Sequence, residues 1–199
     1  MKKILLPVVI SALALFTLTA CGPPLAHEIH YASALEKYPN IVKQNTAENY
    51  DKFKNQTWVN GPRLGEIGNY RFMRALADGK KTVDFIQLYV YRFGWGTDGY
   101  DFHSAYDQNG KKLEFNKIRY EKDWDIYGTT EDGQTEYRPY TIDDAVVTIS
   151  YKELVKFRNS GLTVKFYGRL GNKVVEMPAV YITDFLSVLE ERYKLKGLK

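Results

Sequence analysis

Cysteine and histidine are scarce in this sequence, with one Cys and three His among 199 residues. A single thiol excludes an intramolecular disulfide, so an apolar core must supply the stability of the fold. Neither sign of charge dominates, because 28 basic residues stand against 24 acidic ones. With 44% hydrophobic and 26% charged residues, the composition excludes a disordered tail, a collagen-like fibre and a polytopic membrane protein. The length favours a single domain.

The only long apolar run lies at the N-terminus. Lys2 and Lys3 precede residues 4–16, which are nearly all apolar. This run is shorter than the roughly 20 residues that span a bilayer. It has the length of a signal-peptide core, about 7–15 residues. Leu18-Thr19-Ala20-Cys21 follows, and the whole segment resembles the signal peptide and lipobox of bacterial lipoproteins.

The resemblance implies that residues 1–20 are a signal peptide and that Cys21 is the lipidated first residue of the mature protein. Diacylglycerol on its thiol, with palmitate-like acyl chains, would hold the protein on a membrane. An ordinary secreted protein is the alternative. Gly22 follows the acceptor cysteine, which favours the outer membrane, facing the periplasm, in a bacterium with two membranes. No thiol is then left for catalysis or metal binding in the folded part.

Removal of the signal peptide also lowers the positive charge. Without Lys2 and Lys3 the chain has 26 (28 − 2) basic residues against 24 acidic ones. The high pI of the precursor therefore does not indicate nucleic-acid binding. The expected partners are the membrane, through the lipid on Cys21, and an envelope protein or glycan.

Hydrophobic periodicity divides the mature chain in two. Residues 21–55 are interpreted as lipid anchor, tether and helical lead-in, with a short helix over 46–54, and residues 56–199 as a single globular domain. Alternation predicts strands over residues 57–59, 70–77, 82–93, 102–106 and 112–120, the last four as two hairpins. The strand over 82–93 is apolar on both faces, which predicts a central strand covered on both sides. Polar residues 121–141 are expected to form a long surface loop.

The C-terminal third carries the clearest local signals. A strand over 145–150 leads into Ser150 and Glu153, which have the spacing of a capping box for a short helix. A hairpin over 162–177 follows, and Pro178 precedes an amphipathic helix over 179–194. The predicted fold class is α+β, with a mainly antiparallel sheet of six to eight strands. The short helix and the C-terminal amphipathic helix pack on that sheet.

The mature part also resembles, loosely, uncharacterised bacterial envelope lipoproteins. The residues that carry this resemblance are Gly61-Pro62 and the stretches 89–95, 146–166 and 178–189. The resemblance implies no activity, so it assigns no functional residue.

The loop over residues 94–100 is the strongest candidate for a binding site. Its three glycines permit close approach of the backbone, and Trp95 and Tyr100 offer flat aromatic faces suited to sugars or peptides. The alternative is a hairpin connection whose aromatic rings pack on the edge of the sheet. We expect partial exposure of Tyr100 and more complete burial of Trp95.

Asp98, Asp101 and His103 lie next to this loop. A carboxylate beside a histidine can act as a general base with its orienting group, which is the basis of an alternative reading as a carboxylate-dependent hydrolase. A surface pair on one strand face explains Asp101 and His103 equally well. The sequence shows no other catalytic constellation, so no catalytic residue and no cofactor are assigned, and an enzyme is the less favoured reading.

Two segments have metal-ligand spacing but are incomplete. His27 and His30 are three residues apart and lack a third ligand. Residues 123–128 begin like a calcium loop, but position five is Tyr127 and position twelve is Gln134 in place of the Glu that binds calcium through both oxygens. No metal site is expected. The leading interpretation is a non-catalytic binding or structural module of the envelope, and the alternatives are a periplasmic hydrolase and a toxin-immunity lipoprotein.

Overall fold

The computed structural model describes residues 28–29, 35, 37, 40–79 and 82–195. Cys21, the signal peptide, His27 and His30 lie outside the described residues. The expectations that rest on them therefore stay predictions.

Most elements of the described chain are strands, and helices are few among them. The elements are β1 Glu28–Ile29, α2 Ile41–Asn45, β2 Ala47–Asp51, β3 Gln56–Asn60, β4 Arg63–Glu66, β5 Asn69–Asp78, β6 Thr82–Trp95, β7 Phe102–Asp107, β8 Glu114–Thr129, β9 Thr135–Ile149, α3 Tyr151–Lys156, β10 Leu162–Gly168, β11 Asn172–Met177, α4 Ala179–Arg192 and β12 Lys194–Leu195. The α+β class with a mainly antiparallel sheet is therefore confirmed.

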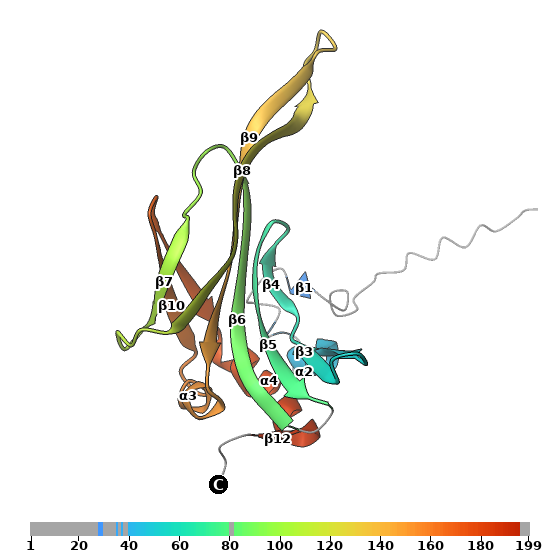
Figure 1. Cartoon of the computed structure of the whole chain (residues 1–199), viewed down its shortest axis with the longest axis vertical. Coiled ribbons are helices and arrows are strands. Elements are labelled where there is room, and N and C mark those ends of the chain that lie inside the picture. Colours follow the sequence, from blue (N-terminus) through green and yellow to red (C-terminus); the bar gives the residue numbers. More distant parts are fainter. Residues whose placement is uncertain (1–27, 30–34, 36, 38–39, 80–81, 196–199) are drawn as a thin grey trace, which may run out of the picture.

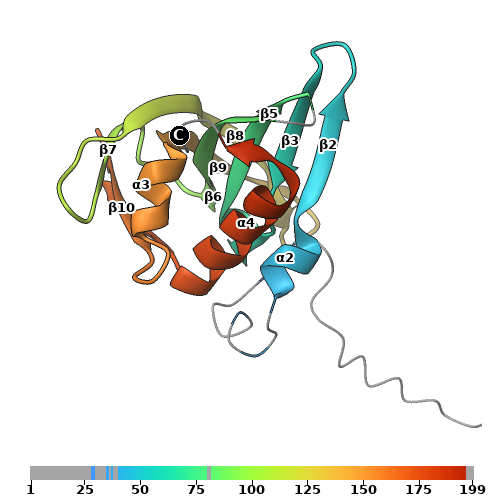
Figure 2. The same ribbon diagram turned by 90° about the horizontal axis from the view of Figure 1, so that it is seen from below.

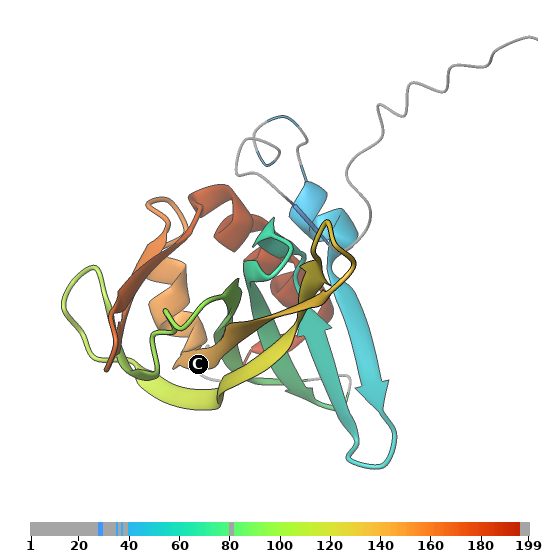
Figure 3. The same cartoon turned by 90° about the horizontal axis from the view of Figure 1, so that it is seen from above.

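The strands form two sheets. The large sheet has the order β1-β4-β5-β6-β9-β8, with β2 and β3 continuing from β5 and β12 pairing with β6. The small sheet has the order β11-β10-β7. Figure 2 and Figure 3 show α3 and α4 in the space between the two sheets. The buried side chains of both sheets and both helices form one apolar core.

The C-terminal helix α4 anchors this core. It begins directly after Pro178, and its buried stripe includes Tyr181 and Phe185. The Tyr181 hydroxyl donates a hydrogen bond to the Pro62 carbonyl at 2.7 Å. A side chain at Gly61 would clash with that hydroxyl, so glycine is needed for this close approach. Ahead of α3, the expected capping box of Ser150 and Glu153 is confirmed.

The β5–β6 hairpin is confirmed, and β6 is central, between β5 and β9. The expected cover on both faces of β6 is wrong. Only the face with Ile86, Leu88 and Val90 packs into the core. The opposite face is half-buried because aromatic rings from β5 lie against it. Tyr70 is stacked on Tyr91 at 4.8 Å, and the Phe72 ring is tilted against that of Tyr89 at 4.9 Å. Cross-strand aromatic pairs thus replace a second covering layer.

The N-terminal boundary of the packed fold differs from expectation. The helix expected over 46–54 is wrong, because residues 47–51 form β2, which pairs with β3. Just before it, Ile41 and Val42 of α2 are buried in the main core. The packed fold thus includes residues upstream of 56.

The hairpin expected over 102–120 is correct only at its turn. β7 pairs with β10 in the small sheet, whereas β8 pairs with β9 in the large one. A single bridge from Tyr106 to Lys112 links the two strands near the turn. This connection therefore joins the two sheets at a corner.

Candidate functional site

The long surface loop expected over 121–141 is wrong, since these residues are the outer halves of β8 and β9 and the turn between them. We call this segment, residues 121–141, the arm. Figure 1 shows it rising beyond all other strands, and Figure 3 shows it end-on. Its register runs without interruption from Lys122 opposite Thr141 to Ile126 opposite Tyr137.

One face of the arm carries three exposed apolar side chains. Trp124 lies opposite Pro139, and Ile126 lies opposite Tyr137. Directly opposed residues of an antiparallel pair point to the same face, as do residues two apart on one strand. The Trp124 side chain is 65% exposed and that of Tyr137 59%. These exposed apolar side chains are therefore grouped on one face of the arm and are not scattered singly over the surface.

The opposite face carries an aromatic cluster at the base of the arm. Trp95, at the end of β6, contacts Phe93, Tyr127 and Tyr140 edge to face, with ring centroids 5.4, 5.2 and 6.3 Å apart. The Arg138 guanidinium lies 3.7 Å from the centre of the Tyr127 ring. Trp95 is 40% exposed, so the expectation that it is more completely buried than Tyr100 is wrong.

The arm is acidic. It contains six carboxylates and two basic side chains. Tyr140 donates a hydrogen bond to Glu121 at 2.6 Å, and this bond raises the pKa of the Tyr140 hydroxyl to about 12. The nearby Asp123 and Asp125 each accept a hydrogen bond from the backbone N–H of the next residue. They lie on a strand, so the calcium-loop geometry is absent, and no group of metal-ligating side chains occurs among the described residues.

A buried carboxylate fixes the loop that leads away from the arm. Asp143 of β9 is only 1% exposed. It accepts hydrogen bonds from the backbone N–H groups of Tyr100 at 3.0 Å and Asp101 at 2.8 Å. The Arg92 guanidinium lies 3.5 Å from it and also donates to Thr141 at 3.1 Å. We call Asp143, Arg92 and these two N–H groups the latch, because they hold residues 96–101 against the sheet.

Tyr100 behaves as expected. Its ring is partly exposed, stacked on Phe102 at 5.1 Å. The Arg92 guanidinium lies 5.0 Å from the centre of the same ring. The two rings therefore do not form one site. Tyr100 contacts Phe102 and Arg92 of the latch, whereas Trp95 contacts aromatic rings of the arm.

Among the described residues, no hydrogen bond joins Asp98 or Asp101 to His103, although His103 lies close enough to act on the charge of Asp101. Asp101 contacts Lys117 at 2.7 Å and Arg169 at 3.5 Å. The hydrogen bond from Lys117 holds the pKa of the Asp101 carboxyl below its usual value. His103 is exposed and shares a hydrogen bond with Ser104, and Asp98 is exposed. Asp101 is thus a structural anion, not a group poised to accept a proton at neutral pH.

Sequence reasoning missed the arm and the latch. The arm lacks one-sided alternation because both its faces meet solvent. The latch joins residues 43 positions apart in the chain, so no local pattern indicates it.

No protein-family model matches the chain, and no curated protein matches it. Across residues 40–79 and 82–195, no helix has both the length and the apolar character needed to cross a membrane.

Proposed function

We propose that this protein is a lipid-anchored protein of the bacterial envelope that binds another protein through its arm and performs no catalysis. The observation that carries the proposal is the exposure of apolar side chains on both faces of the arm. Trp124, Ile126 and Tyr137 lie on one face and Trp95 and Tyr127 on the other.

A protein fits these two faces better than a glycan does. A sugar ring stacks on one aromatic face, whereas covering both faces of a projecting hairpin needs a groove that surrounds it. Within the described residues, β8 pairs with β9 alone, so no strand covers its outer edge. A partner strand can add to such an edge. The six carboxylates of the arm favour a partner with basic residues around the groove.

The proposed anchor keeps the start of the fold near a membrane. Seven residue steps separate Cys21 from Glu28, where β1 pairs with β4. A fully extended chain covers at most about 3.3–3.6 Å per residue. The lipid on Cys21 therefore holds the start of the fold within roughly 25 Å of the bilayer surface.

Site-specific photo-crosslinking tests the arm. A photoreactive residue replaces Trp124 in one variant, Tyr137 in a second and Phe53 in a third. Phe53 is the matched control, because it is 90% exposed at another hairpin tip, between β2 and β3. We expect discrete protein adducts in cells from positions 124 and 137 and none from position 53.

Adducts at all three positions, or at none, contradict binding through the arm. The identity of the adduct separates a resident envelope protein from an incoming toxin. Enzymatic release of glycan from an adduct would support the glycan alternative instead.

Acyl labelling tests the anchor separately. We expect the wild-type chain to incorporate a palmitate analogue and Cys21→Ser to incorporate none and to remain uncleaved, because Cys21 is the only thiol. Labelling of Cys21→Ser would show that the lipobox interpretation is wrong, whatever the crosslinks show.

A further inference from the structure

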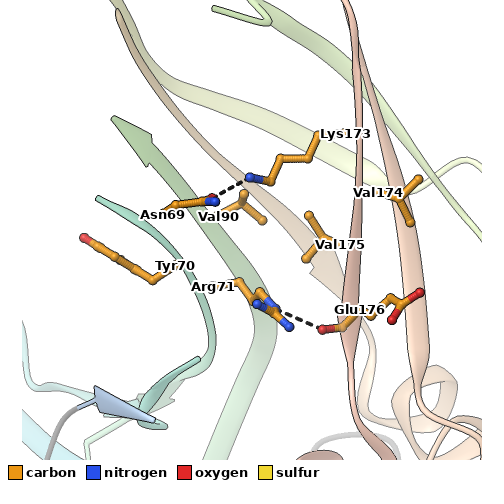
Figure 4. A pocket seen from close by; sticks show the side chains of 8 residues that line it. All are labelled: Asn69, Tyr70, Arg71, Val90, Lys173, Val174, Val175 and Glu176. Carbon is orange, nitrogen blue, oxygen red and sulfur yellow. Dashed lines mark hydrogen bonds between the residues drawn. The ribbon is translucent and has the colours of Figure 1, made fainter. Parts of the chain in front are cut away.

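A cavity of about 340 Å³ lies between the two sheets, away from the arm. β5 and β6 of the large sheet form one wall, and β11 of the small sheet forms the other (Figure 4). Val90 and Val175 give the cavity apolar sides. Arg71 and Lys173 reach across it from opposite walls, as Figure 4 shows.

Both cations in the cavity bond only to neutral acceptors. The Lys173 ammonium donates to the side-chain oxygen of Asn69 at 2.5 Å. The Arg71 guanidinium donates to the backbone carbonyls of Glu176 at 3.0 Å and Leu64 at 3.2 Å. Within the described part of the chain, neither cation has a carboxylate within ion-pair distance. Figure 4 shows the Glu176 carboxylate directed away from the cavity.

The charged side chains around the cavity give it a net positive charge. Burial, together with the nearby positive charges of Arg92 and Arg71, lowers the pKa of Lys173 to about 8. Asp143 opposes this shift. However, the Asp143 carboxylate is already held by Arg92 and the two N–H groups of the latch. Burial also lowers the pKa of Arg71, while the charge of Glu176 raises it.

We propose that this cavity binds a small ligand through a carboxylate or phosphate group held between Lys173 and Arg71. An ammonium and a guanidinium that lack anionic partners are the side chains that bind such oxyanions most strongly. Rotation of the Asn69 amide presents its NH₂ group to the same anion. Val90 and Val175 provide contact for the apolar part of the ligand. The site shares no residue with the arm, so it stands independently of the proposed function.

The reactivity of Lys173 toward an acylating reagent tests the proposal on the unchanged protein. A neutral amine reacts and an ammonium does not. A bound anion that raises the pKa by one to two units lowers the neutral fraction at pH 8 from about one half to between one tenth and one hundredth. We therefore expect inorganic phosphate or acetate to slow acylation of Lys173 by about 5- to 50-fold, measured by peptide mass spectrometry.

Lys165 is the internal control, since it lies on the adjacent strand β10 and is exposed to solvent. We expect its acylation rate to be the same in phosphate, acetate and sodium chloride of equal ionic strength. An effect of phosphate alone assigns the site to phosphate groups, and an effect of acetate alone assigns it to carboxylates. Equal slowing by sodium chloride, or no slowing by either oxyanion, overturns the proposal.

Two variants add a second readout. We expect phosphate or acetate, whichever slows acylation, to raise the melting temperature of the wild-type protein and of Lys165→Met but not of Lys173→Met. Should Lys173→Met fail to fold, Arg71→Gln replaces it, with the acylation of Lys173 as the measurement. Retained protection of Lys173 in Arg71→Gln contradicts a site held between the two cations.

Discussion

Removing the carboxylate of Asp143 should destabilise the protein more than any change on its surface. Asp143→Ala leaves the buried N–H groups of Tyr100 and Asp101 without an acceptor and Arg92 without its counter-charge. An unsatisfied buried donor costs about 1–3 kcal/mol, and breaking a buried ion pair costs about 3–5 kcal/mol. Arg92 is partly exposed, which reduces its share. We expect a loss of about 3–5 kcal/mol in the free energy of unfolding.

The Asp143→Asn variant distinguishes the contribution of the hydrogen bonds to stability from the contribution of the negative charge. The amide keeps one oxygen for the two N–H groups and loses the attraction to Arg92, so we expect a smaller loss of about 1–3 kcal/mol. Asp98→Ala, an exposed change in the same loop, should alter stability by less than about 0.5 kcal/mol. Urea unfolding followed by circular dichroism measures all three variants. If Asp143→Ala unfolds at the wild-type urea midpoint, the latch does not stabilise the fold. If Asp143→Asn loses as much free energy of unfolding as Asp143→Ala, the hydrogen bonds to the two N–H groups are not as described.

Three further predictions concern the core and the cavity. Phe185→Ala, which removes a fully buried ring of α4, should cost about 3–5 kcal/mol in urea unfolding, and a cost no larger than that of the exposed Glu191→Ala would contradict the assigned helix face. Tyr181→Phe removes the hydrogen bond to Pro62 and should cost about 1–3 kcal/mol by the same assay, unless Pro62 gains another donor. The lowered pKa of Lys173 means that the folded state binds fewer protons than the unfolded state above pH 8. Wild-type stability relative to Lys173→Met should therefore rise by about 1–3 kcal/mol between pH 8 and 10.5, and a flat difference across that range would refute the shift.

The parts of the fold that the sequence predicts are those with local causes. The β5–β6 hairpin follows from two strand-like segments on either side of the Asp78-Gly79 turn. The capping box follows from Ser150 and Glu153, whose side chains each accept a hydrogen bond from the other residue's backbone N–H. α4 follows from an apolar stripe after Pro178. Each signal lies within a few residues of the structure it produces.

The candidate site lacks such signals. The arm exposes both faces, so its residues show none of the alternation that reports a buried side. Asp143 and Lys173 act through residues far away in the chain, on another strand or another sheet. Pairing between distant strands depends on register, which single-sequence patterns do not encode.

The free edge of β8 also bears on how copies of this protein behave toward each other. Two arms placed edge to edge would complete each other's hydrogen bonds and bury Trp124 and Ile126, as in the first step of aggregation. The six carboxylates of the arm oppose this by repulsion, as charged gatekeepers do beside exposed apolar strands. Neutralising them at acidic pH should turn a monomer into a self-associating species, visible by light scattering. The acidity of the arm thus opposes pairing between copies of this chain.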